Sequence, residues 1–143
     1  MLNLRKYITS IQRPGRYVGG EINAYLKPFE LAEVRVVFVF PDVYELGMSG
    51  LGMELLYHIV NRIEYAMADR AYLPWVDMRN LMREKGELLF GIESKRPIKE
   101  FDIVAFSVGY ELNYTNVLEC LSLAGIPVQA GNCLLYTSPS PRD

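Results

Sequence analysis

The stretch that decides the fold is Val34–Phe40, VRVVFVF, which is apolar at every position except Arg35. Its residues are mostly β-branched or aromatic, and Pro41 follows directly. Such a run is typical of a parallel strand that is covered on both faces, so we predict a buried strand here. After a loop, apolar residues recur at helical spacing and predict an amphipathic helix over about residues 50–64. The residues that mark it are Leu51, Leu55, Leu56, Ile59, Val60 and Ile63.

Further along the chain, strand-like and helix-like segments continue to alternate. The expected elements are strands at residues 68–73, 102–108 and 126–129, a helix over 77–86 that Asp77 caps, and a helix from Asn113 or Asn116 to Gly125. Short connections between such units enforce right-handed crossovers and a parallel sheet. The fold class is therefore doubly wound α/β, a flavodoxin-like open parallel sheet. Because such a sheet needs about five strands, we expect it to be incomplete at the C-terminus.

Residues 1–32 precede this pattern. Apolar residues between Leu4 and Ile11 recur at helical spacing and predict a short amphipathic helix, which Pro14 would end. The following residues, 15–32, contain glycines and alternate apolar with polar positions. We therefore expect an irregular or hairpin-like lead-in to the α/β domain.

The last residues, 133–143 (CLLYTSPSPRD), match the translation of a sequencing-library adapter. The alternative is a natural Ser/Pro-rich linker. On the adapter interpretation, the native sequence is interrupted near Asn132. The expected organisation is then a lead-in over residues 1–32, a partial α/β domain over 33–132 and a non-native tail.

Composition excludes several classes of protein. A net charge of −2 gives no basic footprint for nucleic acid or for an anionic membrane. No apolar run approaches the ~20 residues that would span a bilayer, and the N-terminus lacks the features of a secretion signal. The two cysteines are too few for a disulfide framework and do not have metal-ligand spacing. We expect a cytoplasmic protein without a metal site or catalytic residues in this chain.

Two loops follow strands and could hold a ligand, because open α/β sheets bind ligands outside the carboxyl ends of their strands. The glycines of both loops let the backbone approach a ligand closely. In the first loop, Ser49 could cap the helix that follows, and the free N–H groups at the start of that helix favour an anion. The glycine order in the first loop is GxxGxG, which differs from the dinucleotide motif. The alternative is a tight turn that needs small residues, with polar side chains that only cap helices. The candidate cofactor-binding residues are Asp42, Tyr44, Glu45, Gly47, Ser49 and Gly50 in the first loop and Ser107, Gly109, Tyr110 and Glu111 in the second.

Other reactive or charged residues have simpler interpretations. His58 lies four residues after Glu54, so an ion pair on the helix surface explains it. Cys120 falls in a helical pattern and is expected to be an inert buried thiol. Arg16 and Glu21 could form an ion pair or contact another domain.

Several strings resemble the N-terminal region of bacterial radical SAM proteins that carry a cobalamin-binding-like domain. The resemblance covers nearly all of residues 12–131. It implies a Rossmann-like domain of the cobalamin-binding type, and a radical SAM barrel of the same parent chain as its partner. That barrel would hold a 4Fe–4S cluster and S-adenosylmethionine, so this chain would be inactive by itself. The strings are RPGRYVGGEINAY, VFPDVYELGMSGLGMELLYHIVN, LPWVDMRNLMRE and FDIVAFSVGYELNYTNVLECLSLAGIPV.

The first loop departs from the cobalamin-binding pattern. Domains of the mutase type carry D-x-H-x-x-G, in which the histidine ligates cobalt, whereas this chain has Asp42, Tyr44 and Gly47 at those positions. Tyrosine is a poor substitute for a neutral imidazole, so histidine-based ligation is ruled out here. Cobalamin could still bind without that ligand. The alternatives are a non-catalytic structural or docking module that has lost cobalamin binding, and a free-standing flavodoxin-like protein.

Overall fold

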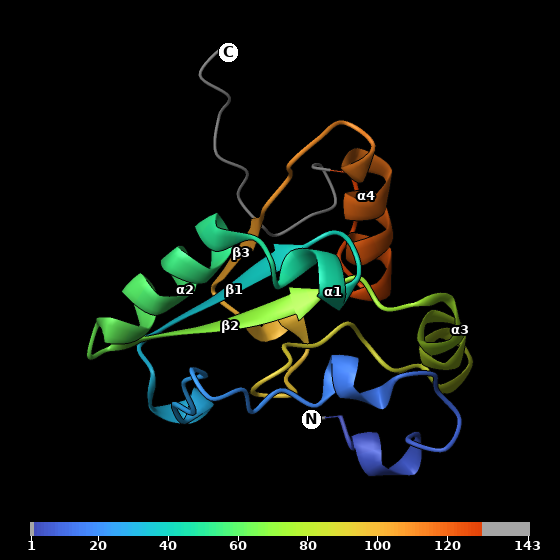
Figure 1. Ribbon diagram of the computed structural model, residues 1–143, viewed down its shortest axis with the longest axis horizontal. Coiled ribbons are helices and arrows are strands. Elements are labelled where there is room, and N and C mark those ends of the chain that lie inside the picture. Colours follow the sequence, from blue (N-terminus) through green and yellow to red (C-terminus); the bar gives the residue numbers. More distant parts are fainter. Residues whose placement is uncertain (1, 130–143) are drawn as a thin grey trace.

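A computed structural model describes residues 2–129 of the chain. Within them, three parallel strands form an open sheet in the order β2-β1-β3 (Figure 1). The strands are β1 (Val34–Phe40), β2 (Ala66–Tyr72) and β3 (Ile103–Phe106). The central strand is the one predicted first, and its bounds agree with the prediction. It pairs with β2 along its whole length, from Val34 opposite Ala66 to Phe40 opposite Tyr72.

Helices cover both faces of this sheet, which confirms the doubly wound α/β class. The main helices are α2 (Leu51–Arg62), α3 (Val76–Lys85) and α4 (Asn113–Leu123), and a short helix, α1 (Tyr44–Gly47), lies in the first loop. Side chains alternate between the two faces of a strand. Val36 and Phe38 accordingly pack in one cluster with residues of α2, while Val37 and Val39 pack in another with residues of α3 and α4.

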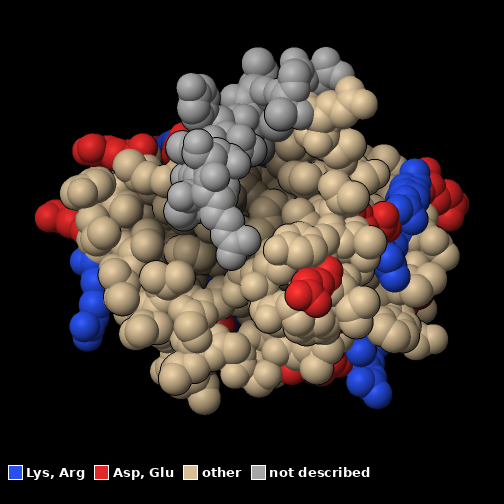
Figure 2. All heavy atoms as spheres, turned by 90° about the horizontal axis from the view of Figure 1, so that it is seen from above, with Lys and Arg blue, Asp and Glu red and all other residues tan. Residues whose placement is uncertain are grey.

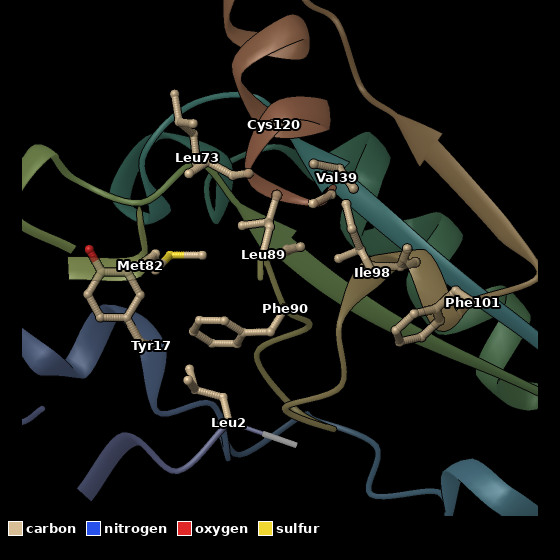
Figure 3. Close-up of a cluster of buried hydrophobic side chains, with 14 of the residues drawn as sticks. Leu2, Tyr17, Val39, Leu73, Met82, Leu89, Phe90, Ile98, Phe101 and Cys120 are labelled. Carbon is tan, nitrogen blue, oxygen red and sulfur yellow. The ribbon is translucent and has the colours of Figure 1, made fainter. Parts of the chain in front are cut away.

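The larger cluster also includes the lead-in. Figure 3 shows Leu2 and Tyr17 beside Phe90 and Met82, and all four are buried. The predicted helix between Leu4 and Ile11 is wrong beyond a single 3-10 turn at Leu4–Lys6. Helices this short are marginal in water, and here the buried ends of the segment determine its path. The remainder of the lead-in is irregular, as expected, with 3-10 turns at Pro14–Tyr17 and Phe29–Leu31.

The prediction of a strand at residues 126–129 is wrong, because the chain there closes the end of helix α4 and does not enter the sheet. Gly125 has a left-handed φ of 67°, and its N–H donates to Ser122. The N–H of Ile126 donates to Leu121, and the Ile126 side chain is buried. These bonds are the helix-terminating Schellman pattern, in which the apolar residue after glycine packs back on the helix. The expected end of the domain near Asn132 and the tail 133–143 lie outside the described residues.

Other boundaries differ in smaller ways. The third strand, β3, is shorter than residues 102–108. It is only partly buried, since a hollow lies against Ala105 and Phe106. The predicted caps are also wrong. Trp75 occupies the cap position of α3 and Leu112 that of α4. Asp77 instead accepts a hydrogen bond at 2.5 Å from the backbone N–H of Gln12, which ties the lead-in to α3.

Helix α2 is buried on an unexpected face. Met53, Tyr57 and Asn61 face the sheet, whereas Leu51 and Leu55 on the opposite side are 80% and 56% exposed. Asn61 is held there by bonds from its amide to the backbone of Tyr57 and Ala68, and by one that it accepts from Ala68. None of the described helices is long and apolar enough to cross a membrane.

Candidate functional site

The two candidate loops meet at the carboxyl end of the sheet. The chain leaves the central strand β1 for β2 on one side and later reaches β3 on the other, so a crevice is expected between the ends of β1 and β3. The Tyr110 hydroxyl donates to Asp42 Oδ2 at 3.3 Å across this crevice. Partial desolvation and the Asp42 carboxylate raise the pKa of Tyr110. The structure therefore brings together one predicted residue from each loop.

Two other predicted residues of the first loop bond to residues of the lead-in. The Tyr44 hydroxyl donates to Glu21, and its ring packs edge-on against Tyr72 at 5.2 Å. Burial is the larger cause and the bond to Glu21 the next, and together they raise the pKa of Tyr44 to about 12. Glu45 accepts from Arg16 Nε at 2.7 Å, and this bond lowers the pKa of Glu45. Arg16 and Glu21 thus have separate partners, so of the two alternatives considered for them the mutual ion pair is not formed.

The glycines and the serine of the first loop serve local structure. A Cβ on Gly47 would lie 2.3 Å from the Tyr72 ring, so the packing of this ring requires glycine there. The Ser49 hydroxyl donates to the Leu46 carbonyl at 2.8 Å, and Gly50 takes the cap position of α2. The prediction that Ser49 caps α2 is therefore wrong, and the first turn of α2 has no side-chain cap.

In the second loop, Ser107 fastens the chain to the central strand. Its backbone N–H donates to the Val39 carbonyl at 2.9 Å. Gly109 and Glu111 are exposed on the same loop. Asn113, which was expected to cap α4, is its first helical residue and is 1% exposed. Within the described part of the chain, neither atom of its amide group has a hydrogen-bond partner.

An apolar hollow of about 310 Å³ lies beside the second loop, between the first half of α2 and the exposed face of β3. No Lys or Arg occurs in residues 36–61 or 102–129. Seen from the side on which α2 lies, most charged side chains stand at the margins of the molecule (Figure 2). Sequence reasoning missed this hollow, because its walls come from elements whose relative position only the fold sets. It is lined by Phe38, Gly52, Met53, Leu56, Ala105, Phe106 and Ser107.

A buried charge cluster on β2 was also missed. The Arg70 guanidinium donates to Glu21 at 3.0 Å, Glu54 at 2.9 Å and Glu93 at 2.8 Å. It also lies 4.6 Å from the centre of the Tyr57 ring. Burial by itself would lower the pKa of Arg70, but the bound carboxylates raise it above its usual value, so Arg70 stays charged.

The predicted pair of His58 with Glu54 is wrong, because Glu54 binds Arg70. The His58 ring instead packs edge-on against Tyr25 at 5.5 Å between centres. The side chain of Tyr25 therefore provides the contact that sequence spacing assigned to Glu54.

The described residues offer no ligand set for an iron–sulfur cluster. Cys120 is the single cysteine within residues 2–129, and it is fully buried in the large core cluster (Figure 3). Burial raises the pKa of this thiol to about 12, so it is protonated at neutral pH. No group of three His, Cys, Asp or Glu side chains in the described residues is placed to bind a metal ion.

Comparison with known proteins gives one match. A family model described as the N-terminal part of radical SAM proteins matches residues 52–132, which is more than half of the chain. Searches of the curated proteins and of the solved structures found no match.

Proposed function

Because the chain belongs to the family of N-terminal regions of radical SAM proteins, we propose that it is a cobalamin-binding-like domain. It would serve a radical SAM barrel in the rest of its parent protein. Membership of the family implies a 4Fe–4S cluster and S-adenosylmethionine in that parent. The described residues do not fit the cluster, since cluster ligation needs thiolates and Cys120 is a buried, protonated thiol. The cluster would therefore bind outside residues 2–129.

The observation that carries the cobalamin proposal is the uncharged hollow beside the crevice. Ligand sites are typically concave and mostly apolar, with a few polar groups at fixed positions. Here the apolar walls include Leu56 and Phe106, and Ser107 lines the hollow beside the loop that carries Tyr110. A hollow of about 310 Å³ with these walls would hold one uncharged part of a large ligand. Cobalamin, when bound, would supply a cobalt centre to the reaction of the parent protein.

The first loop would supply no side-chain ligand to cobalt. Tyr44 replaces the ligating histidine of mutase-type domains, and its hydroxyl is bonded to Glu21. With a pKa of about 12, it is also protonated at neutral pH. We therefore propose that the protein holds cobalamin by the hollow and the crevice without a side-chain ligand to cobalt.

Titration of the chain with hydroxocobalamin, followed by its absorption spectrum and by equilibrium dialysis, tests this proposal. Leu56→Arg would place a charge in the hollow and should weaken binding at least tenfold. Leu51→Arg is the matched control, since Leu51 is on the same helix and does not line the hollow. No uptake by the unmodified chain, or equal loss in both variants, would sink the proposal.

A second candidate is a docking module for the barrel, and the exposed face of α2 favours it. Leu51, Leu55 and Ile59 form an apolar ridge opposite the buried face of the helix. A helix that is apolar on opposite sides is usually buried on both. We propose that the barrel of the parent protein covers this ridge, which would leave α2 sandwiched between the sheet and its partner.

Hydroxyl-radical footprinting of Leu55 and Ile59 tests this candidate. Both side chains should be oxidised in the isolated chain and protected in the intact parent. Equal oxidation in the two proteins would rule out docking on this ridge. The Leu55→Lys variant of the parent separates the candidates. It should detach the barrel from the ridge, so that Ile59 is oxidised, while cobalamin binding is unchanged.

A further inference from the structure

The chain has two buried asparagines with opposite surroundings. The amide of Asn61, on α2, bonds to backbone groups of Tyr57 and Ala68 at 2.9–3.1 Å. Asn113, on α4, is buried to the same degree, yet both its Oδ1 and its Nδ2 lack a partner among the described residues. Buried polar groups in native proteins are nearly always hydrogen-bonded. An unpaired amide at such a position therefore calls for a partner that the described chain does not supply.

The position of Asn113 indicates where this partner would come from. Asn113 shares the inward face of α4 with Cys120 and Ala124, which pack in the core near Val39 and Leu73 (Figure 3). It lies at the end of that face nearest the second loop. It is also the first residue of an eleven-residue helix that has no side-chain cap. The backbone N–H groups of Asn113 and Tyr114 donate to the carbonyls of Tyr110 and Glu111, so the start of α4 is joined to the second loop while the Asn113 amide beside it stays unpaired.

The charges around this position decide the class of ligand. A helix N-terminus by itself favours an anion. However, residues 102–129 contain no Lys or Arg, the crevice carries the carboxylate of Asp42, and Glu111 is exposed on the second loop. An anion would be repelled there. A neutral carboxamide fits better, since its N–H can donate to Asn113 Oδ1 while its oxygen accepts from Nδ2.

We propose that Asn113 determines the affinity of the crevice by pairing with a carboxamide of the bound ligand. This inference rests on the proposed function, because the corrin ring of cobalamin carries carboxamide groups around its rim. Because Asn113 is buried, this pairing requires residues 108–112 to move aside when the ligand binds. Two bonds hold the second loop in place, from Ser107 to Val39 of the central strand and from Tyr110 to Asp42 of the first loop.

Replacement of each asparagine by leucine tests the inference through two readouts. Asn113→Leu removes an amide without a partner, so the urea midpoint of the cofactor-free chain should rise. The same variant loses a pair of neutral hydrogen bonds to the ligand, so its Kd for hydroxocobalamin should increase about tenfold. Asn61→Leu removes a bonded amide, so its urea midpoint should fall. If Asn113 had only a structural role, its replacement would change the urea midpoint and leave the Kd for hydroxocobalamin unchanged.

The outcomes separate this inference from the proposed function. If Asn113→Leu lowers the urea midpoint or fails to fold, the amide has a partner inside the protein and the inference is overturned. If its Kd equals that of the unmodified chain, the inference fails while the proposed function stands; Asn113→Ala, which introduces no larger side chain, must give the same result. If the unmodified chain does not bind hydroxocobalamin, the proposed function fails first and this inference fails with it.

Discussion

Replacing Arg70 by methionine should destabilise the chain strongly. The Arg70 side chain is 2% exposed and neutralises Glu93, whose side chain is 4% exposed. Removing one partner of a buried ion pair costs about 3–5 kcal/mol, because the other charge is left without compensation. Glu21 and Glu54 are more exposed and can turn toward water, so each adds about 0–1 kcal/mol. The expected loss is a large share of the roughly 5–15 kcal/mol that stabilises a typical domain.

Urea unfolding followed by circular dichroism measures this loss. With a slope of about 2 kcal/mol per M for a chain of this size, the midpoint should fall by about 2 M. Arg83→Met is the matched control. Arg83 is 52% exposed in its pair with Glu119, so its removal should cost no more than about 1 kcal/mol. A loss for Arg70→Met no larger than that of the control would refute the reasoning.

The dependence on pH gives an independent check. Arg70→Met removes one of the two groups whose bonds lower the pKa of Glu21, so the deficit of this variant should shrink at low pH, where Glu21 is protonated with or without Arg70. In the unmodified chain, burial raises the pKa of Glu21, but the bonds from Tyr44 and Arg70 outweigh it and lower the pKa overall. The stability that Glu21 contributes is thus present at neutral pH and is lost as the pH falls through this lowered pKa.

Two glycines and one cysteine allow further tests. Gly47→Ala should destabilise the chain by about 1–3 kcal/mol in urea, because the new Cβ would overlap the buried Tyr72 ring; a neutral result would show that the ring can move. Gly52→Ala should instead stabilise it by up to about 1 kcal/mol, since Gly52 lies in α2 with open space around it. Cys120 should resist alkylation at pH 8 until the chain unfolds, because its thiol is buried with a pKa of about 12. Peptide mapping by mass spectrometry would detect early modification, which would contradict this.

The central strand could be predicted because nothing in its sequence competes with burial on both faces. Helix α2 shows the limit of the same method. It carries apolar residues on opposite sides, so periodicity predicts the helix but does not select which side meets the sheet. Tertiary contacts make that choice, through the bonds of Asn61 to Ala68 and the packing of Tyr57 beside Arg70. At residues 126–129, an apolar run was interpreted as a strand although its first side chain closes the preceding helix.

The candidate site could likewise be predicted only in part. Asp42 and Tyr110 could be placed together, because the carboxyl ends of parallel strands meet at one edge of a sheet. Glu45 could not be recognised as a partner of Arg16, since nothing in the sequence shows where the lead-in lies. The Arg70 cluster is hidden for the same reason. Its carboxylates are 16 to 49 positions away along the chain and meet only through the fold.

The lead-in has a consequence for the timing of folding during synthesis. Tyr7 bonds to Glu87, which lies 80 positions later, and Gly20 bonds to Glu93, 73 positions later. At translation rates of roughly 5–20 residues per second, the lead-in waits about 4–16 s after its own synthesis for its partners. During that interval its apolar side chains, including Leu2 and Tyr17, have no core to enter. The lead-in is therefore secured only after residues 87–93 have been synthesised, and a chaperone would meet it during that interval.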